Sequence, residues 1–380
     1  MTLAGVVLVA SCREAAWPTP SREAAGAGGG SASGAGVAAA RREASGDGEP
    51  ALGSDGGGSG RSPAALTSIA APGAIAPAGG RLPAVSPAPA GGRLPAVSPT
   101  PAGGRLPAVP STPATAARVR HVIIISEDGL RPDALLLAHG PVMAEVMKHA
   151  AYSLTAMTIR HASTLPSHGA MLSGFDEEAH GVSWNTWRPG RGSILVPTIF
   201  DAAGRAGQSS AAFVGKQKLE HVIPPASVGL FSRPGFLCHA VSHAAAQYFV
   251  ERRPTVEFVH FADPDEIGHH QGWMSDEQIQ AIRGADQCVA NMIDAVHRAG
   301  ADADTLFILS ADHGGHGKNH TGRIKEDRLI PWIAWGAGIH PHKLASPVST
   351  MDTAATALWA LGLPRPLTME GHPVEEAFGD

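Results

Sequence analysis

Short apolar runs recur along the chain from residue 121 onward. Each run is four to six residues long and consists of β-branched, aromatic or small residues with few polar interruptions. This is the pattern of strands that are buried on both faces. The runs are HVIII (121–125), AAFVG (211–215), VEFVHF (256–261), TLFILS (305–310) and WIAW (332–335).

Helical patterns separate these runs, most clearly in SDEQIQAIRGADQCVANMIDAVHRAG (275–300). Ser275 with Gln278 predicts a capping box at the start of this helix, and Gly300 predicts its C-cap. Strands that alternate with helices predict an α/β fold with a mostly parallel central sheet and helices on both faces. In such sheets, ligands bind beyond the carboxyl ends of the strands.

The chain before residue 118 has a different composition. All 19 histidines, both tyrosines and all ten phenylalanines follow residue 117, whereas the earlier part is rich in Gly, Ala, Pro and Ser. Such a composition cannot bury a core, so residues 13–117 are predicted to form a disordered linker. Residues 118–380 are long enough for one substantial catalytic domain.

A twelve-residue repeat lies within this linker. PAGGRLPAVSPA (77–88) recurs with small changes at 89–100 and 101–112. A solenoid is the competing interpretation, but a unit with one Leu and one Val has no apolar face on which neighbouring units could stack. Glycine pairs and repeated prolines instead favour a semi-extended spacer.

The extreme N-terminus, MTLAGVVLVASC (1–12), is an apolar run of small residues that ends at Cys12. It resembles the lipobox at which bacterial lipoproteins are cleaved and lipidated, although no basic residue precedes the run. This resemblance implies an exported protein, periplasmic or anchored to the cell envelope by a lipid on Cys12. The alternative is a short apolar stub. No later stretch of about 18 apolar residues predicts a membrane-spanning helix.

Charge and cysteine content argue against two classes of protein, nucleic-acid-binding proteins and zinc fingers. Since 8 of the 29 basic and 6 of the 34 acidic residues lie before residue 118, the remainder carries 21 and 28, a net charge of −7. This balance argues against nucleic-acid binding.

Cys238 and Cys288 lack zinc-finger spacing. They are interpreted as buried small residues, which could form a disulfide if the protein is exported.

Acidic and histidine residues cluster directly after three of the predicted strands. The clusters are SEDGLRPD after the first strand, ADPDEIGHH after VEFVHF and ADHGGHGKNH after TLFILS. One Asp after a strand is usually a helix cap or turn residue, but three clusters at one sheet edge could hold two divalent cations. Without cations, so many buried carboxylates would repel one another.

A hydroxyl accompanies these clusters in HASTLPSHGAMLSG (161–174). Pro166 suits the first turn of a helix, which places Thr164 near the helix N-terminus, where free N–H groups attract an anion. There a hydroxyl can be both a metal ligand and a nucleophile. The alternative is an ordinary N-cap.

Taken together, EDGLRPD, STLPSHGAMLSG, EEAHGVSWN, DPDEIGHH and SADHGGHGKNH resemble the alkaline phosphatase superfamily, specifically its type I phosphodiesterase/nucleotide pyrophosphatase branch. The resemblance covers essentially all of residues 119–380. It implies two divalent metal ions, most simply Zn²⁺. By position, it assigns one ion to Asp128, Thr164, Asp312 and His313.

The resemblance assigns the other ion to Asp265, His269 and one further histidine. The branch usually takes that histidine from far downstream, whereas this chain offers His316 and His320 close by. His320 resembles the ligand of compact bacterial members and is expected to be the third ligand, with His316 as the alternative. Asn185 matches an asparagine that donates to a phosphoryl oxygen, and it could instead be an ordinary loop residue. Lys216 and Lys318 are left outside the expected site.

The expected reaction is hydrolysis of a small phosphodiester or pyrophosphate, with Thr164 attacking phosphorus and a phosphothreonine intermediate. A phosphomonoesterase or phosphonate hydrolase would use the same ions. A sulfatase is less favoured, because Thr164-Leu165-Pro166-Ser167-His168 lacks both the formylglycine precursor and the arginine of the sulfatase motif. A non-catalytic surface lipoprotein is the alternative from another class. Oligomeric state is not predicted.

Overall fold

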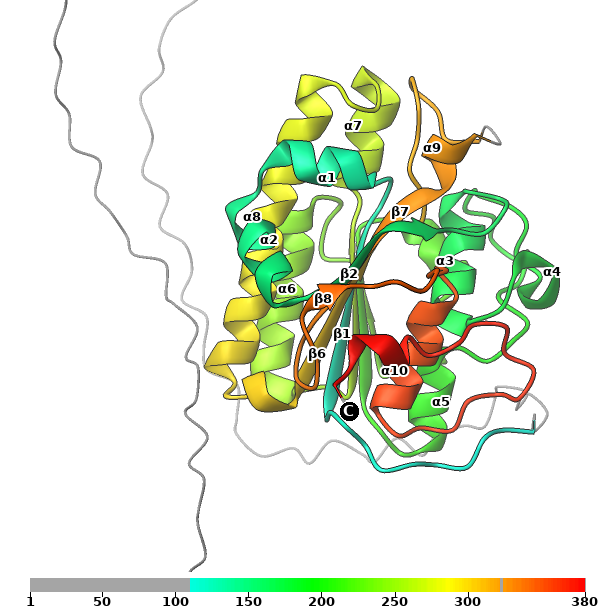
Figure 1. Ribbon diagram of the computed structural model, residues 1–380. Helices are drawn as coiled ribbons and strands as arrows, with labels where there is room; N and C mark the ends of the chain where they lie inside the picture. Colours follow the sequence, from blue (N-terminus) through cyan, green and yellow to red (C-terminus); the bar gives the residue numbers. More distant parts are fainter. Residues whose placement is uncertain (1–109, 322–323, 380) are drawn as a thin grey trace, which may run out of the picture. The chain divides into compact units, whose positions relative to one another are not determined.

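The computed structural model describes residues 110–321 and 324–379 (Figure 1). The expected signal segment and most of the expected linker lie outside these residues. The described chain begins before the expected domain boundary: the N–H groups of Thr112 and Thr115 donate to the carbonyls of Arg365 and Gly362. None of the helices in the described part combines the length and hydrophobicity that crossing a bilayer requires.

The centre of the molecule is an eight-stranded sheet with the order β4-β3-β5-β1-β6-β7-β2-β8. The strands are β1 His121–Glu127, β2 Ala151–Met157, β3 Ser210–Val214, β4 Leu230–Ser232, β5 Val256–Phe261, β6 Thr305–Ser310, β7 Leu329–Gly336 and β8 His342–Lys343. β7 pairs antiparallel with both β6 and β2, while the other pairings are parallel. The prediction of a mostly parallel sheet is therefore confirmed.

Helices cover both faces of the sheet, as predicted. Figure 1 shows one layer on one side and a second layer on the other. The first layer holds α1 Pro132–Ala138, α2 Pro141–Val146, α6 Cys238–Arg252, α7 Asp263–Gln271 and α8 Asp276–Arg298. The second holds α3 Thr164–Ser173, α4 Glu177–His180, α5 Ile199–Arg205 and α10 Asp352–Ala360, and the short α9 Lys325–Arg328 precedes β7.

Short 3-10 turns complete the connections between these elements. They are η1 Met147–His149, η2 Gln217–His221, η3 Asp302–Asp304 and η4 Glu375–Ala377. Of these, η2 matters most for function, because it follows β3 directly at the edge where the expected site residues lie.

The ends of α8 differ in detail from the prediction. Ser275 accepts a hydrogen bond from the Gln278 N–H, as a capping residue should. The Gln278 side chain, however, accepts from the N–H of Met274 and not from that of Ser275, so the reciprocal half of the capping box is absent. The C-cap is Ala299, and Gly300 follows it with φ of 62°, a left-handed conformation that glycine adopts without strain.

A buried carboxyl group lies inside the sheet on β5. Glu257 is 0% exposed, and neither of its carboxyl oxygens has a hydrogen-bond partner among the described residues. The ring of the next residue, Phe258, contacts His168 of α3, so Glu257 points to the opposite face, where α6 packs on β5. Burial raises the pKa of Glu257 well above its usual value, which keeps this group neutral.

Candidate active site

The carboxyl ends of several parallel strands meet at one edge of the sheet and bring the expected site residues together. Asp128 follows β1, Asp312 and His313 lie just beyond β6, and Asp265 lies in α7, which begins two residues after β5. The same edge receives Thr164 after β2. The convergence follows from the parallel pairing of β1 with β5 and β6.

Asp128, Asp312 and His313 form an inner group in which all three residues are 0% exposed. Their potential ligand atoms lie within 4.8 Å of one another. The Nε2 atom of His313 is 3.5 Å from Oδ1 of Asp128 and 3.3 Å from Oδ2 of Asp312. The backbone N–H of Gly129 donates to Oδ1 of Asp312 at 3.1 Å, which fixes that carboxylate in place.

Thr164 borders the inner group. It is the first residue of α3, which has Ser163 in extended conformation at its N-cap position. The threonine is therefore not the N-cap itself. Its Oγ1 lies 3.5 Å from Nε2 of His313. A hydroxyl at this position lies beside the inner group, at a helix start where the Leu165 N–H is already bonded to Asn185 and Pro166 has no N–H to offer.

Asp265, His269 and His320 form an outer group, again with ligand atoms within 4.8 Å of one another. Asp265 and His269 stand four residues apart on one face of α7. The ring of His320 stacks on that of His313, with centroids 3.7 Å apart, and this contact joins the two groups. His269 is exposed, so the outer group is closer to solvent than the inner group.

His316, the alternative to His320, lies elsewhere. Its Nδ1 atom is 2.6 Å from Oδ1 of Asp327, a buried residue outside both groups. His270 is exposed, and its Nε2 atom lies 3.0 Å from Oε1 of Glu266.

The imidazoles of His313, His269 and His320 carry their protons on the same ring nitrogen. Their Nδ1 atoms face backbone carbonyls, namely those of Gly314 (2.8 Å), Lys318 (3.1 Å) and Ala162 (2.8 Å) for His313, His269 and His320. A carbonyl only accepts, so each Nδ1 carries the proton and each Nε2 presents a lone pair. These lone pairs face carboxylate oxygens, which also only accept.

Each of the three aspartates has an oxygen without a hydrogen-bond partner. These buried atoms are Oδ1 of Asp128, Oδ1 of Asp265 and Oδ2 of Asp312. Nε2 of His313 lies 3.8 Å from Oδ1 of Asp265, and Nε2 of His320 lies 3.9 Å from the same oxygen. Acceptors aimed at acceptors repel, whereas a cation among them would satisfy all of them.

Burial dominates the proton equilibria of the neutral imidazoles and of one aspartate. It lowers the pKa of His320 to about 3, with the neighbouring His313 adding to the effect. Burial, followed by the charge of Asp128, raises the pKa of Asp312 to about 7. For Asp128 burial acts in the same upward direction, but the Lys216 ammonium and a hydrogen bond from His260 hold its pKa well below the usual value.

Lys216 enters the site in a way that the sequence interpretation missed. It follows β3 and is only 9% exposed, with Nζ 2.7 Å from Oδ2 of Asp128 and in contact with Oδ2 of Asp265. It therefore links the two groups by bridging one carboxylate of each. The sequence did offer one indication that Lys216 belongs to the site, because it follows a strand, as the aspartates do. Lys318, by contrast, is exposed and donates to the carbonyl of His270.

Asn185 lies beside the start of α3. Its Oδ1 accepts from the N–H of Leu165 at 3.0 Å and from Nζ of Lys218 at 3.1 Å. These bonds leave the amide NH₂ group as the side available for donation. Burial, followed by the charge of Lys216, lowers the pKa of Lys218. Lys218 is a second cation that the sequence interpretation did not single out.

Two further buried histidines contact Asp128 and Thr164. His260 accepts from the N–H of Gly215 through Nδ1, so its Nε2–H donates to Oδ2 of Asp128 at 2.9 Å. His168 lies 2.7 Å from the carbonyl of Thr164 through Nδ1 and 2.9 Å from Oγ of Ser126 through Nε2. Neither was expected, because neither stands in the clusters that follow the strands.

Comparison with known proteins agrees with this architecture. The model of the type I phosphodiesterase/nucleotide pyrophosphatase family matches residues 122–331. Among solved structures, murine ectonucleotide pyrophosphatase/phosphodiesterase 5 in complex with AMP superposes with a TM-score of 0.58 at 14% identity, covering 68% of this chain and 100% of that chain. An alkaline phosphatase superfamily protein from Vibrio parahaemolyticus gives 0.54 at 17% identity, covering 72% and 74%.

Curated relatives are similar over part of their length. GPI ethanolamine phosphate transferase 1 of Gibberella zeae is 26% identical over 271 residues, which cover 59% of this chain and 27% of that protein. The 2,3-bisphosphoglycerate-independent phosphoglycerate mutase of Ectopseudomonas mendocina is 26% identical over 188 residues, covering 47% and 34%. The chain thus spans about a quarter to a third of these relatives. From the family match across its sheet and site, the chain belongs to the type I phosphodiesterase/nucleotide pyrophosphatase family.

Proposed function

We propose that this protein is a metal-dependent hydrolase of small phosphate esters, with phosphodiesters or pyrophosphates preferred, and that Thr164 is its nucleophile. One observation carries the proposal. Three buried aspartates present unpartnered oxygens to imidazole lone pairs whose protons lie on the far side of each ring. That arrangement is unfavourable unless positive charge occupies the space between them.

The residues present fit two divalent cations. Asp128, Asp312 and His313 would hold one together with the Thr164 hydroxyl, and Asp265, His269 and His320 would hold the other. Mixed nitrogen and oxygen donors of this kind suit Zn²⁺. When bound, the two ions would lower the pKa of the Thr164 hydroxyl and offset the charge that develops on the leaving oxygen.

The chain's own groups supply the rest of the chemistry. Thr164 Oγ1 gives up its proton and bonds to phosphorus as the bond to the leaving oxygen breaks, and the leaving oxygen takes a proton from solvent. Water then attacks the phosphothreonine, and Oγ1 recovers a proton. The Asn185 amide and the Lys218 ammonium lie beside the start of α3, where they can stabilise phosphoryl oxygens.

The aromatic side chains beside Asn185 bear on substrate choice. Trp187 is 37% exposed and packs on His221 with centroids 4.7 Å apart, and the guanidinium of Arg191 lies 4.3 Å above the ring of Trp184. An apolar surface with adjacent positive charge suits a leaving group larger than water, which favours a diester over a monoester. A phosphomonoesterase or phosphonate hydrolase would use the same nucleophile.

The test compares Thr164→Ala with Thr164→Ser in the purified, zinc-loaded protein. With bis-p-nitrophenyl phosphate and p-nitrophenyl phosphate as substrates, the alanine variant should lose activity by on the order of 10³-fold or more. The serine variant, which keeps the hydroxyl, should retain a measurable part of it. Equal rates for wild type and Thr164→Ala would eliminate the nucleophile. A folded, zinc-loaded protein that is inactive on both esters would favour the non-catalytic alternative.

The cellular location is part of the proposal. The apolar segment that ends at Cys12 supports export and lipid attachment at the cell envelope. Incorporation of a labelled fatty acid into the wild-type chain, and its loss in Cys12→Ser, would test this step separately from catalysis.

A further inference from the structure

A disulfide joins two helices on one face of the sheet. Cys238 is the first residue of α6, Cys288 lies in the middle of α8, and their sulfurs are bonded. The two Cα atoms are 6.0 Å apart, and the residues are 1% and 0% exposed. The structure therefore resolves the alternative that the sequence left open, since the two cysteines are both buried and paired.

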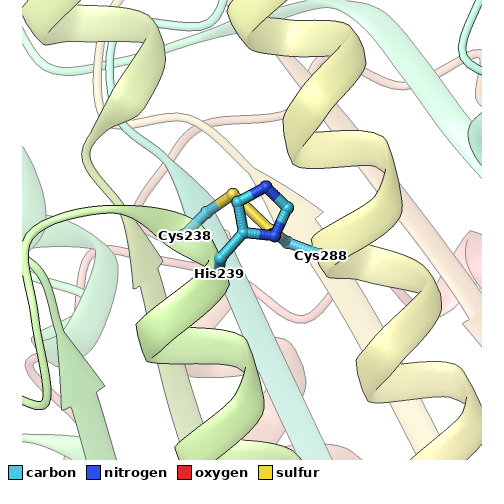
Figure 2. Close-up of side chains that lie close together, drawn as sticks. All are labelled: Cys238, His239 and Cys288. Atoms are coloured by element: carbon cyan, nitrogen blue, oxygen red, sulfur yellow. A yellow bond between two sulfur atoms is a disulfide. The ribbon is translucent and has the colours of Figure 1, made fainter.

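A histidine lies against this disulfide. Figure 2 shows the imidazole of His239 beside the bond that joins the sulfurs. Its Nδ1 atom is 3.7 Å from Sγ of Cys288. His239 is itself exposed, whereas both cysteines are buried.

The three side chains have the spacing of a soft metal site. Their ligand atoms lie within 4.8 Å of one another. In a tetrahedral zinc site, with Zn–S near 2.3 Å and Zn–N near 2.0 Å, a sulfur and a nitrogen ligand are about 3.6 Å apart. The observed distance between His239 Nδ1 and Cys288 Sγ is close to this value. To bind the same ion, the two sulfurs would need to separate to about 3.8 Å.

We propose that reduction of the Cys238–Cys288 disulfide converts these residues into a binding site for one thiophilic cation of the Zn²⁺ type. A dithiol reductant gives two electrons and two protons to the disulfide and is itself oxidised to a disulfide. The cation then displaces one proton from each thiol and bonds to both sulfurs and to the neutral imidazole of His239. A fourth position faces solvent on the exposed side of His239 and takes water.

This site is chemically distinct from the proposed active site. The inner and outer groups contain only nitrogen and oxygen donors, whereas this one contains two sulfurs. Thiolate ligands give bound Co²⁺ an intense charge-transfer absorption in the near ultraviolet, which nitrogen and oxygen ligands do not. Co²⁺ therefore reports the two kinds of site separately, and the inference does not rest on the proposed function.

The experiment uses the full chain with Cys12→Ser, so that no other thiol contributes. The protein is reduced with dithiothreitol, freed of it without oxygen, and titrated with Co²⁺. The thiolate band should appear at one equivalent in the reduced protein and be absent in the oxidised protein. It should vanish in Cys238→Ser and in Cys288→Ser. His239→Gln should weaken binding by about tenfold or more, since it removes one of three ligands.

A second measurement distinguishes the loss of a metal ligand from the loss of the folded structure. His239 is exposed, so His239→Gln should leave the reduced fold intact. Zn²⁺ should then raise the unfolding temperature of reduced wild type by more than that of reduced His239→Gln. In Asp265→Asn the thiolate band should persist, which separates this site from the active site. A reduced wild-type protein without the band, or a band that His239→Gln leaves unchanged, would overturn the proposal.

Discussion

Among the described residues, both the edge of the sheet and strand β5 bury carboxyl groups with unpartnered oxygens, and the electrostatic cost of burial is met differently in the two regions. At the edge of the sheet, the unpartnered oxygens of Asp128, Asp265 and Asp312 face imidazole lone pairs and lie near the Lys216 ammonium. On β5, Glu257 is alone, and burial keeps it protonated. Burial of an acid therefore does not indicate a cation. Convergence of several acceptors with fixed proton positions does.

The largest effect is expected when the edge region loses a carboxylate. Asp312→Asn keeps the shape of the side chain but removes one anionic ligand, so activity should fall by on the order of 10³-fold and bound zinc from two equivalents toward one. Kinetic assays and metal analysis of the purified variant measure both. Glu257→Gln is the matched control and should leave activity and metal content unchanged. Comparable losses of activity and zinc in Asp312→Asn and Glu257→Gln would contradict the proposal that only the edge region binds metal.

The β5 region should be visible in the pH dependence of unfolding. The folded-state pKa of Glu257 is raised above the unfolded value, so its contribution to stability is complete below the unfolded pKa and is lost as the pH rises toward the folded pKa. Urea unfolding of Glu257→Met should show a shallower decline, while Glu127, whose pKa burial raises to about 8, still contributes to the slope in both proteins. A wild-type slope that persists in the variant would contradict the assignment.

Within the edge region, the outer group should tolerate substitution better than the inner one, because His269 is exposed and its loss leaves two ligands. His269→Gln should lower activity by about 10- to 100-fold, and added zinc should restore part of it. The neighbouring, exposed His270→Gln is the control and should behave as wild type. Failure of zinc to restore any activity would mean that His269 does more than bind a metal.

The smallest effect concerns the lysine that bridges both groups. Lys216→Met removes a positive charge 2.7 Å from Oδ2 of Asp128, so zinc should bind more tightly, by up to about tenfold. The metal-free protein should become less stable, since two buried carboxylates lose their counter-ion. Competition with a chromophoric chelator measures the affinity. Lys318→Met, at an exposed lysine, should change neither property. Weaker zinc binding in Lys216→Met would show that the ammonium supports the metal site.

Much of the fold was predictable because its central strands are short, mostly apolar runs. VEFVHF and TLFILS coincide with β5 and β6 residue for residue. β2 escaped prediction because AYSLTAM mixes polar with apolar residues and changes register against β7 between Ser153 and Ala156. The short strands β4 and β8, at the two edges of the sheet, carry too little pattern to stand out.

The convergence of the aspartates and Thr164 could be predicted from the sequence, because the aspartates lie just after strands and Thr164 begins a helix. The buried groups around them could not be predicted, since Lys216 and His260 act through contacts that only the folded chain creates. The choice between His320 and His316 likewise depended on how one loop folds back, which placed His316 against Asp327. Pairing of Cys238 with Cys288 needed the packing of α6 on α8.

The main-chain carbonyls that hold the Nδ1 protons of His313, His269 and His320 have a consequence for how the proposed metal ions would be taken up. Because the polypeptide itself dictates the angle of every ring, removal of the ions does not free the rings to turn. The emptied protein should therefore refill at once when metal returns, with no refolding step. Exchange of one metal for another can then follow the supply in the surroundings, with the scaffold unchanged throughout.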